Sequence, residues 1–104
     1  MVIREGRRST RLRLPARFNR GAIRYSSGEF EAALEDFDYC VAVDPHDAAP
    51  YFNRAATRDA LGDRAGAVTD LERFLQLTDN PQWRDTASDL LARWRQVDEP
   101  EVGR

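Results

Sequence analysis

Apolar residues recur along this chain at intervals of three and four positions, which is the spacing of one face of an α-helix. The spacing is clearest in a stripe formed by Phe30, Ala33, Leu34, Phe37, Cys40 and Val41. Similar stripes occupy four other segments, Phe18–Ser26, Tyr51–Ala60, Ala67–Leu75 and Trp83–Trp94. No segment alternates apolar and polar residues over the length of a strand. The pattern therefore predicts an all-α protein with five helices.

Glycine and proline residues predict where three of these helices end. Gly28 and Gly62 follow the first and third stripes, and a glycine there can adopt the left-handed conformation that closes a helix. Pro45 follows the second stripe and biases the residue before it away from helical backbone.

Three residues predict where helices begin. Pro15 and Pro81 suit the first turn of the first and fifth helices, where the missing N–H does no harm. Asp47 is expected to cap the N-terminus of the third helix.

Two stretches of the chain repeat each other at an offset of 34 residues. The identical positions of the first stretch are Phe18, Asn19, Arg20, Ala22, Arg24, Gly28, Ala33 and Asp36; those of the second are Phe52, Asn53, Arg54, Ala56, Arg58, Gly62, Ala67 and Asp70. A period of this length is typical of a helix–turn–helix unit that stacks on copies of itself to bury its apolar face. We therefore expect an α-solenoid of antiparallel helix pairs, an architecture that presents surfaces for binding.

These residues resemble the signature of tetratricopeptide repeats. The resemblance is carried by Gly28, Phe30, Ala33, Phe37 and Pro45 in the first unit, and by Gly62, Ala67 and Leu71 in the second. It covers two repeats, 14–47 and 48–81, and residues 82–97 resemble the solvating helix that ends such arrays. The sequence departs from the family pattern at Arg17, Arg24, Arg64 and Asp79.

The small residues of each unit predict close helix packing. Gly21 and Ala55 can let the first helix of each pair approach the second, while Phe37 and Leu71 fill the space between pairs. Two repeats are fewer than the three that a stable stack usually needs, so we expect the helix at 82–97 to be required.

Charge is distributed unevenly along the 104 residues, a length that suits one compact domain. Residues 1–24 hold eight arginines and one acid, a balance of +7, whereas the remainder holds eight arginines and 17 acids, a balance of −9. We expect residues 1–13 to form a flexible basic leader and residues 98–104 a polar tail. Every basic residue is arginine and none is lysine, which is typical of a GC-rich coding sequence.

The sequence favours a bacterial protein of the cytoplasm. Its single cysteine excludes an internal disulfide framework. The first residues lack the apolar core of a secretory signal, and no apolar run approaches the length needed to span a membrane.

No arrangement of residues points to catalysis, so we expect that the protein is not an enzyme and holds no cofactor. Cys40 lies on an apolar stripe, where a buried core thiol is expected rather than a nucleophile. His46 is the single histidine, and a metal site there would lack a second nitrogen or sulfur ligand, so no metal site is expected.

A peptide-binding groove is the favoured functional site. By resemblance, the first helix of each tetratricopeptide pair lines the concave face. The residues expected to line it are Phe18, Asn19, Ala22, Tyr25, Phe52, Asn53, Ala56 and Asp59. The aromatic residues would anchor a partner segment, and the asparagine amides would hold its backbone. The alternative is that Phe18 and Phe52 only pack between the repeats.

The resemblance to tetratricopeptide repeats also allows the ligand-binding positions of the family to be compared with those of this chain. Some tetratricopeptide repeat proteins hold chaperone C-termini with a carboxylate clamp of lysine, arginine and asparagine residues. Of the clamp positions, this chain keeps Asn53, but it carries Phe18, Ala22, Trp83 and Ala87 where the clamp has other polar or basic residues. The resemblance therefore implies a more apolar ligand than the clamp takes.

Arginine and aspartate recur at a separation of 16 residues in both repeats, as Arg20 with Asp36 and as Arg54 with Asp70. In a helical hairpin this separation can place the two side chains opposite each other, so we expect two equivalent ion pairs. The alternative is that the two arginines contact a ligand.

The arginine-rich leader supports two further hypotheses. The residues Arg4, Arg7, Arg8, Arg11 and Arg13 could neutralise phosphates of a nucleic acid. This hypothesis is disfavoured, because no aromatic residue is interleaved to stack on bases and the rest of the chain is acidic. The leader could instead contact an acidic surface, including that of a second copy, so a homodimer is the other alternative.

Overall fold

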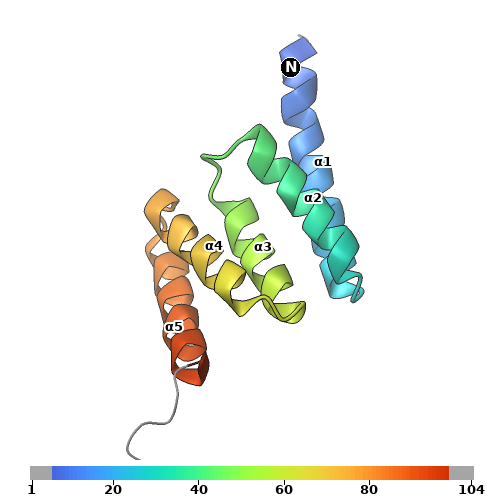
Figure 1. Ribbon diagram of the computed structural model, residues 1–104. Helices are drawn as coiled ribbons and strands as arrows, with labels where there is room; N and C mark the ends of the chain where they lie inside the picture. The colour runs from blue at the N-terminus through green and yellow to red at the C-terminus, as the bar shows by residue number, and fades with distance from the viewer. Residues whose placement is uncertain (1–5, 99–104) are drawn as a thin grey trace, which may run out of the picture.

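Five helices make up the part of the chain that the computed structural model describes, which is the backbone of residues 6–98 and the side chains of residues 14–96. They are α1 (Gly6–Ser26), α2 (Phe30–Val43), α3 (Ala49–Ala60), α4 (Arg64–Leu77) and α5 (Pro81–Asp98) (Figure 1). No strand occurs within these residues, so the predicted all-α class is confirmed. None of the described helices is long and apolar enough to cross a membrane.

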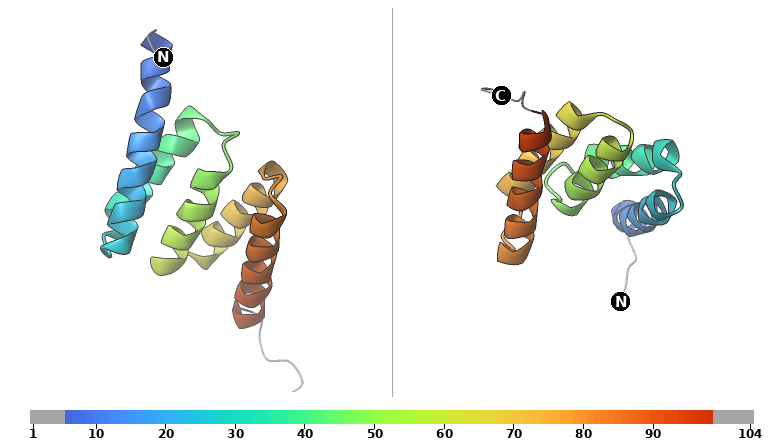
Figure 2. Two further views of the ribbon diagram at one scale, coloured as in Figure 1. Left: turned by 180° about the vertical axis from the view of Figure 1, so that it is seen from behind. Right: turned by 90° about the horizontal axis from the view of Figure 1, so that it is seen from below.

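The helices are arranged as an α-solenoid. The helices α1 and α2 form one antiparallel pair, α3 and α4 form a second, and α5 packs against α4 (Figures 1 and 2). The two pairs meet where α2 packs against α3. The helices α1 and α5 therefore lie at opposite ends of the array.

Equivalent glycine turns close the first helix of each pair. Gly28 and Gly62 have φ values of 82° and 87°, in the left-handed region that favours glycine. In the first turn, the Glu29 N–H donates to the Arg24 carbonyl at 2.8 Å, and in the second, the Asp63 N–H donates to the Arg58 carbonyl at 2.8 Å. These bonds satisfy carbonyl groups that the helix end leaves free. The predicted helix ends are confirmed.

Two helix starts differ from those predicted. The helix α1 begins at Gly6, so residues 6–13 of the expected flexible leader are helical and Pro15 lies inside the helix. Residues 1–5 of that leader lie outside the described residues. The helix α3 has Ala48 rather than Asp47 at its cap, because Pro50 occupies the first turn and sets the start at Ala49.

The start of α5 follows the sequence expectation. The Trp83 N–H donates to the Asn80 side-chain oxygen at 3.0 Å, and Pro81 is the first helical residue.

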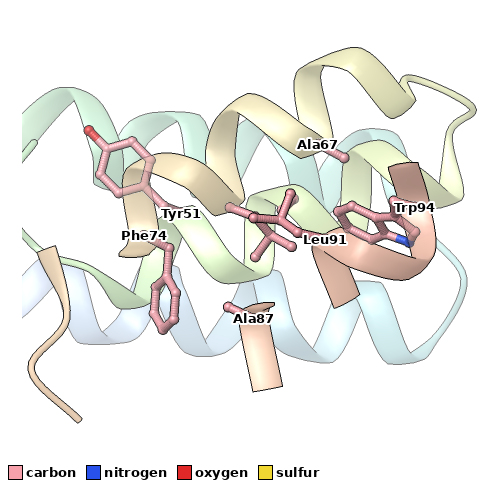
Figure 3. Packing of buried hydrophobic residues seen from close by; sticks show 8 residues of the cluster. Tyr51, Ala67, Phe74, Ala87, Leu91 and Trp94 are labelled. Carbon is pink, nitrogen blue, oxygen red and sulfur yellow. The ribbon is translucent and has the colours of Figure 1, made fainter. Parts of the chain in front are cut away.

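The hydrophobic core is concentrated in α3, α4 and α5. Its buried residues are Tyr51, Ala55, Ala67, Leu71, Phe74, Ala87, Leu91 and Trp94. The side chains of Leu91 and Trp94 of α5 point toward those of the second pair (Figure 3). By contrast, the described part of α1 contributes no buried hydrophobic side chain. The helix α5 therefore closes the core at one end, while the first pair depends on other contacts.

The two pairs achieve close packing with different combinations of small and large residues. In the first pair, a Cβ atom added to Gly21 would lie 2.8 Å from Cε1 of Phe37, whose ring is fully buried. The equivalent positions of the second pair hold Ala55 and Leu71, which are also fully buried. The larger Phe37 is thus accommodated by the absence of a side chain on the facing helix.

A buried aspartate accepts several arginine hydrogen bonds within each pair. In the first pair, Arg20 donates to both carboxylate oxygens of Asp36, from Nε at 3.0 Å and from Nη2 at 2.7 Å. Arg17 and Arg24 each donate to the same carboxylate at 3.2 Å. The Asp36 side chain has no exposed surface. The departures from the family pattern at Arg17 and Arg24 therefore supply partners for a buried charge.

The second pair repeats this arrangement. Arg54 donates to both oxygens of Asp70, from Nε at 3.0 Å and from Nη2 at 2.9 Å, and Arg58 donates from Nη1 at 3.0 Å. The structure thus brings together both pairs of residues that the separation of 16 positions predicts.

An arginine and a tyrosine exchange places between the repeats. The Arg17 guanidinium of α1 lies 4.0 Å from the ring centre of Tyr39 in α2. At the equivalent positions, Tyr51 lies in α3 and Arg73 in α4, with the guanidinium 6.0 Å from the ring centre. The cation–π contact is therefore kept in both pairs although its two members are swapped.

The close approach at Gly21 predicts the effect of adding one methyl group there. We expect Gly21→Ala to lower the free energy of unfolding by about 1–2 kcal/mol, because overpacking outweighs the gain in helix propensity. In a Phe37→Leu background, which reproduces the second pair, the same substitution should cost less. Urea denaturation followed by circular dichroism measures both differences. An equal cost in both backgrounds would show that the two side chains are not in close contact.

The buried carboxylate of Asp36 predicts a pH dependence of stability. The hydrogen bond from Arg20 lowers the pKa of Asp36 below its ordinary value, against the opposing effect of burial. The interaction therefore stabilises the fold above the unfolded-state pKa of about 3.9 and is lost as pH falls through the lower folded-state pKa.

We expect Asp36→Asn to destabilise the protein by about 1–3 kcal/mol at neutral pH. The difference from the wild type should shrink on acidification through the folded-state pKa. Urea denaturation over a pH series measures this. A difference that is independent of pH would contradict the role of the ionised carboxylate.

Candidate functional site

A hollow of about 380 Å³ lies where α1, α3 and α5 face one another. Its lining residues are Phe18, Asp47, Ala48, Ala49, Phe52, Asn53, Phe74, Thr78 and Trp83. A second hollow of about 190 Å³ adjoins it and shares Phe18, Asp47 and Ala49. We refer to the two hollows together as the groove. It runs along the N-terminal half of α3, between the helices at both ends of the array.

Aromatic rings form the wall of the groove on the side of α5. The Phe52 ring meets the rings of Phe74 and Trp83 edge-on, each with a centroid distance of 5.1 Å. Phe74 is buried in the core, whereas Trp83 keeps 49% of its surface exposed. Phe52 therefore joins the core to the groove, so packing and groove lining are not exclusive roles for this residue.

Phe18 has a comparable position in the first pair. Its ring meets that of the buried Phe37 edge-on at a centroid distance of 5.8 Å, and it lines both hollows. Two of the predicted aromatic residues, Phe18 and Phe52, thus pack against buried core side chains.

Few polar groups line the groove. Asn53 lines the larger hollow and Asn19 the smaller one. Asp47 lines both, and no lysine or arginine side chain is among the lining residues. The groove is therefore apolar with a single carboxylate on its wall.

Half of the predicted groove residues lie elsewhere. Ala22, Tyr25, Ala56 and Asp59 line neither hollow. The Tyr25 ring packs edge-on against Phe30 at 5.4 Å, within its own helix pair. Asp59 accepts a hydrogen bond from Nε of Arg64 at 2.7 Å. In both α1 and α3, these residues lie closer to the C-terminal end of the helix than the residues that line the hollows.

Trp83, Phe74 and Asp47 line the groove in addition to the residues expected there from the sequence. Trp83 could have been found by applying the period of 34 residues once more, because it is equivalent to Ala49 and Pro15. All three of these positions line the hollows. No comparable signal identifies Phe74 or Asp47, because their contribution depends on how the helices cross.

The remaining candidate residues provide no reactive centre. Cys40 is 2% exposed, its thiol donates to the Leu14 carbonyl at 3.8 Å, and burial raises its pKa. A buried thiol with a raised pKa is a poor nucleophile. The backbone N–H of His46 donates to a carboxylate oxygen of Asp44 at 3.2 Å. Among the described residues, no three histidine, cysteine or acidic side chains form a group that could hold a metal ion.

Known proteins provide an independent comparison. No family model matches the chain. Tetratricopeptide repeat protein 36 of Danio rerio is 42% identical to it over 67 residues, which cover 64% of this chain and 35% of that protein. The human protein of the same name is 40% identical over 58 residues, covering 56% and 31% of the two chains. The STIP1 homolog of Dictyostelium discoideum is 32% identical over 65 residues, covering 62% and 11%.

The aligned region spans about a third of the length of tetratricopeptide repeat protein 36. The similarity to these proteins agrees with the helix pairs, the glycine turns and the period of 34 residues described above. The chain is therefore similar to tetratricopeptide repeat proteins over 64% of its length, and its five described helices form an all-α helical repeat of the same kind.

Proposed function

We propose that this chain is a protein-binding module that holds an extended segment of a partner protein in the groove between α1, α3 and α5. The observation that carries the proposal is the half-exposed Trp83 ring, which lies edge-on against Phe52 beside a hollow of about 380 Å³. Exposed aromatic residues next to a hollow are typical anchors of protein interfaces. The rigid support of Phe52 by Phe74 reduces the entropy that binding would cost.

The lining residues favour a particular ligand chemistry. The aromatic wall suits an aliphatic or aromatic side chain, and the Asn53 amide can donate to and accept from an extended backbone. The Asp47 carboxylate disfavours an acidic segment and favours one with a lysine or arginine next to its apolar residues. This chemistry is the opposite of that of a carboxylate clamp, whose basic positions correspond to Phe18, Trp83 and Ala87 here.

Selection of a random peptide library on the full-length chain tests the proposal. We expect enrichment of peptides in which an apolar residue lies next to a lysine or arginine. Trp83→Ala should weaken the binding of an enriched peptide by at least about tenfold, as expected for an interface anchor. Fluorescence anisotropy with the labelled peptide measures the change.

Tyr25→Ala is the matched control for this experiment, because it removes an exposed aromatic ring that lies outside the groove. We expect it to leave peptide affinity nearly unchanged. Failure to enrich any peptide, or equal losses in the two variants, would contradict binding in the groove. For the charge preference, Asp47→Asn should reduce discrimination between arginine and glutamate peptides, whereas Asp85→Asn on the exposed surface of α5 should not.

A further inference from the structure

Arg20 and Arg54 occupy equivalent positions of the two repeats, but they differ in the hydrogen bonding of the guanidinium nitrogen Nη1. Arg20 and Arg54 both bind the aspartate of their own pair through Nε and Nη2. Arg54 also donates from Nη1 to Asp38 of the preceding pair at 3.0 Å. Within the described residues, Nη1 of Arg20 has no such acceptor. Accordingly, 50% of the Arg20 side chain is exposed, compared with 15% for Arg54.

Neighbouring positions show the same difference. Thr57 of α3 is fully buried, whereas Ile23, its equivalent in α1, is 65% exposed. Pro50 is also fully buried, whereas Ala16, its equivalent, is exposed. Ala16, Arg20 and Ile23 follow one another at intervals of four and three residues, so they form one stripe on the helix. We call this stripe the outer face of α1.

The equivalent stripe of α3 consists of Pro50, Arg54 and Thr57, and the helix α2 packs against α3 on this side. It provides Asp38 as the acceptor for Arg54, and its residue Val41 packs against the core cluster that contains Tyr51 and Ala55. Asp38 and Val41 are three residues apart and therefore lie on one side of α2. The stripe on α3 is thus matched by a helix that carries an acid beside an aliphatic residue.

We propose that the outer face of α1 docks an acidic amphipathic helix of a partner protein, in the way that α3 receives α2. An acidic side chain of that helix accepts a hydrogen bond from Nη1 of Arg20, and an apolar side chain covers Ile23. Charge complementarity supports this occupant, because Arg20 lies half-exposed on this face and the sequence of α1 contains no acid. The same charge disfavours contact between the α1 helices of two copies. A nucleic acid would satisfy the charge but would leave Ile23 without an apolar contact.

A helix peptide with the sequence of α2 is a suitable probe, because α2 carries the surface that fits the equivalent stripe. The peptide covers residues 30–47, has serine in place of Cys40, and is held helical by a staple between positions 31 and 35. Both of these positions are exposed in the protein. Binding to the full-length chain is measured by fluorescence anisotropy, and the binding site is located from NMR shifts of the Ile23 methyl groups and Arg20 Nε.

We expect the peptide to bind and to shift the signals of Arg20 and Ile23. Ile23→Asp should weaken binding by at least about tenfold, because it places a carboxylate against an acidic helix. Leu61→Asp is the matched control, since Leu61 is an exposed aliphatic residue in the turn between α3 and α4. It should have little effect, and Asp38→Asn in the peptide should weaken binding.

Several outcomes would overturn the proposal. They are absence of binding at millimolar peptide, equal effects of the two protein variants, and shifts confined to the groove around Trp83. Exchange of the peptide for the α2 helix of the chain itself would also contradict it, and would appear as loss of the native contacts between α1 and α2. If a single-stranded oligonucleotide competes with the peptide and binds Ile23→Asp as well as the wild type, the face recognises polyanions instead. Trp83→Ala should leave peptide binding unchanged, which separates this surface from the groove.

Discussion

Each helix pair of this protein is organised around a buried aspartate that receives two hydrogen bonds from one arginine of the facing helix. A buried carboxylate is unfavourable unless its lone pairs are satisfied, so these contacts restrict how the two helices can slide or rotate past each other. Additional arginines donate further hydrogen bonds to both carboxylates. The planar guanidinium suits this role because its nitrogen atoms are fixed relative to one another.

The same arginines connect the repeats to each other and determine which surfaces remain open. Arg54 binds Asp70 within its pair and Asp38 in the preceding pair, so one side chain fixes the packing within and between repeats. At Arg20, the corresponding position in the first pair, the second contact is lacking among the described residues. Packing at the other end is completed by α5, which covers the core with Leu91 and Trp94 and places Trp83 beside the groove.

The repeat period and the residue types allowed most of the fold to be predicted from the sequence. The glycine turns, the five helices and the approach of each arginine to its aspartate follow from local conformational preferences and from a spacing that recurs in both units. The start of α1 was less predictable, because Pro15 suits a first helical turn but is accommodated inside a helix here. The start of α3 depends on Pro50, which outweighs the capping preference of Asp47.

The groove was only partly predictable. The sequence pattern identifies Phe18, Asn19, Phe52 and Asn53 on the first helix of each pair, but it does not show how far along those helices the hollow extends. That extent depends on how the helices cross. Tyr25 and Asp59 instead contact residues across the turn of their own helix pair, Phe30 and Arg64 respectively. Trp83 was expected in the apolar stripe of the fifth helix, and the structure leaves half of its surface exposed beside the groove.

A double-mutant cycle on Arg54 and Asp70 tests the central role of the buried aspartate most directly. The free energy of unfolding would be measured by urea denaturation for the wild type, Arg54→Met, Asp70→Asn and the double variant. We expect a coupling energy of more than about 1 kcal/mol, because the two side chains share hydrogen bonds in a site with little exposure to water. Additive effects, with a coupling energy of less than about 0.3 kcal/mol, would contradict the account.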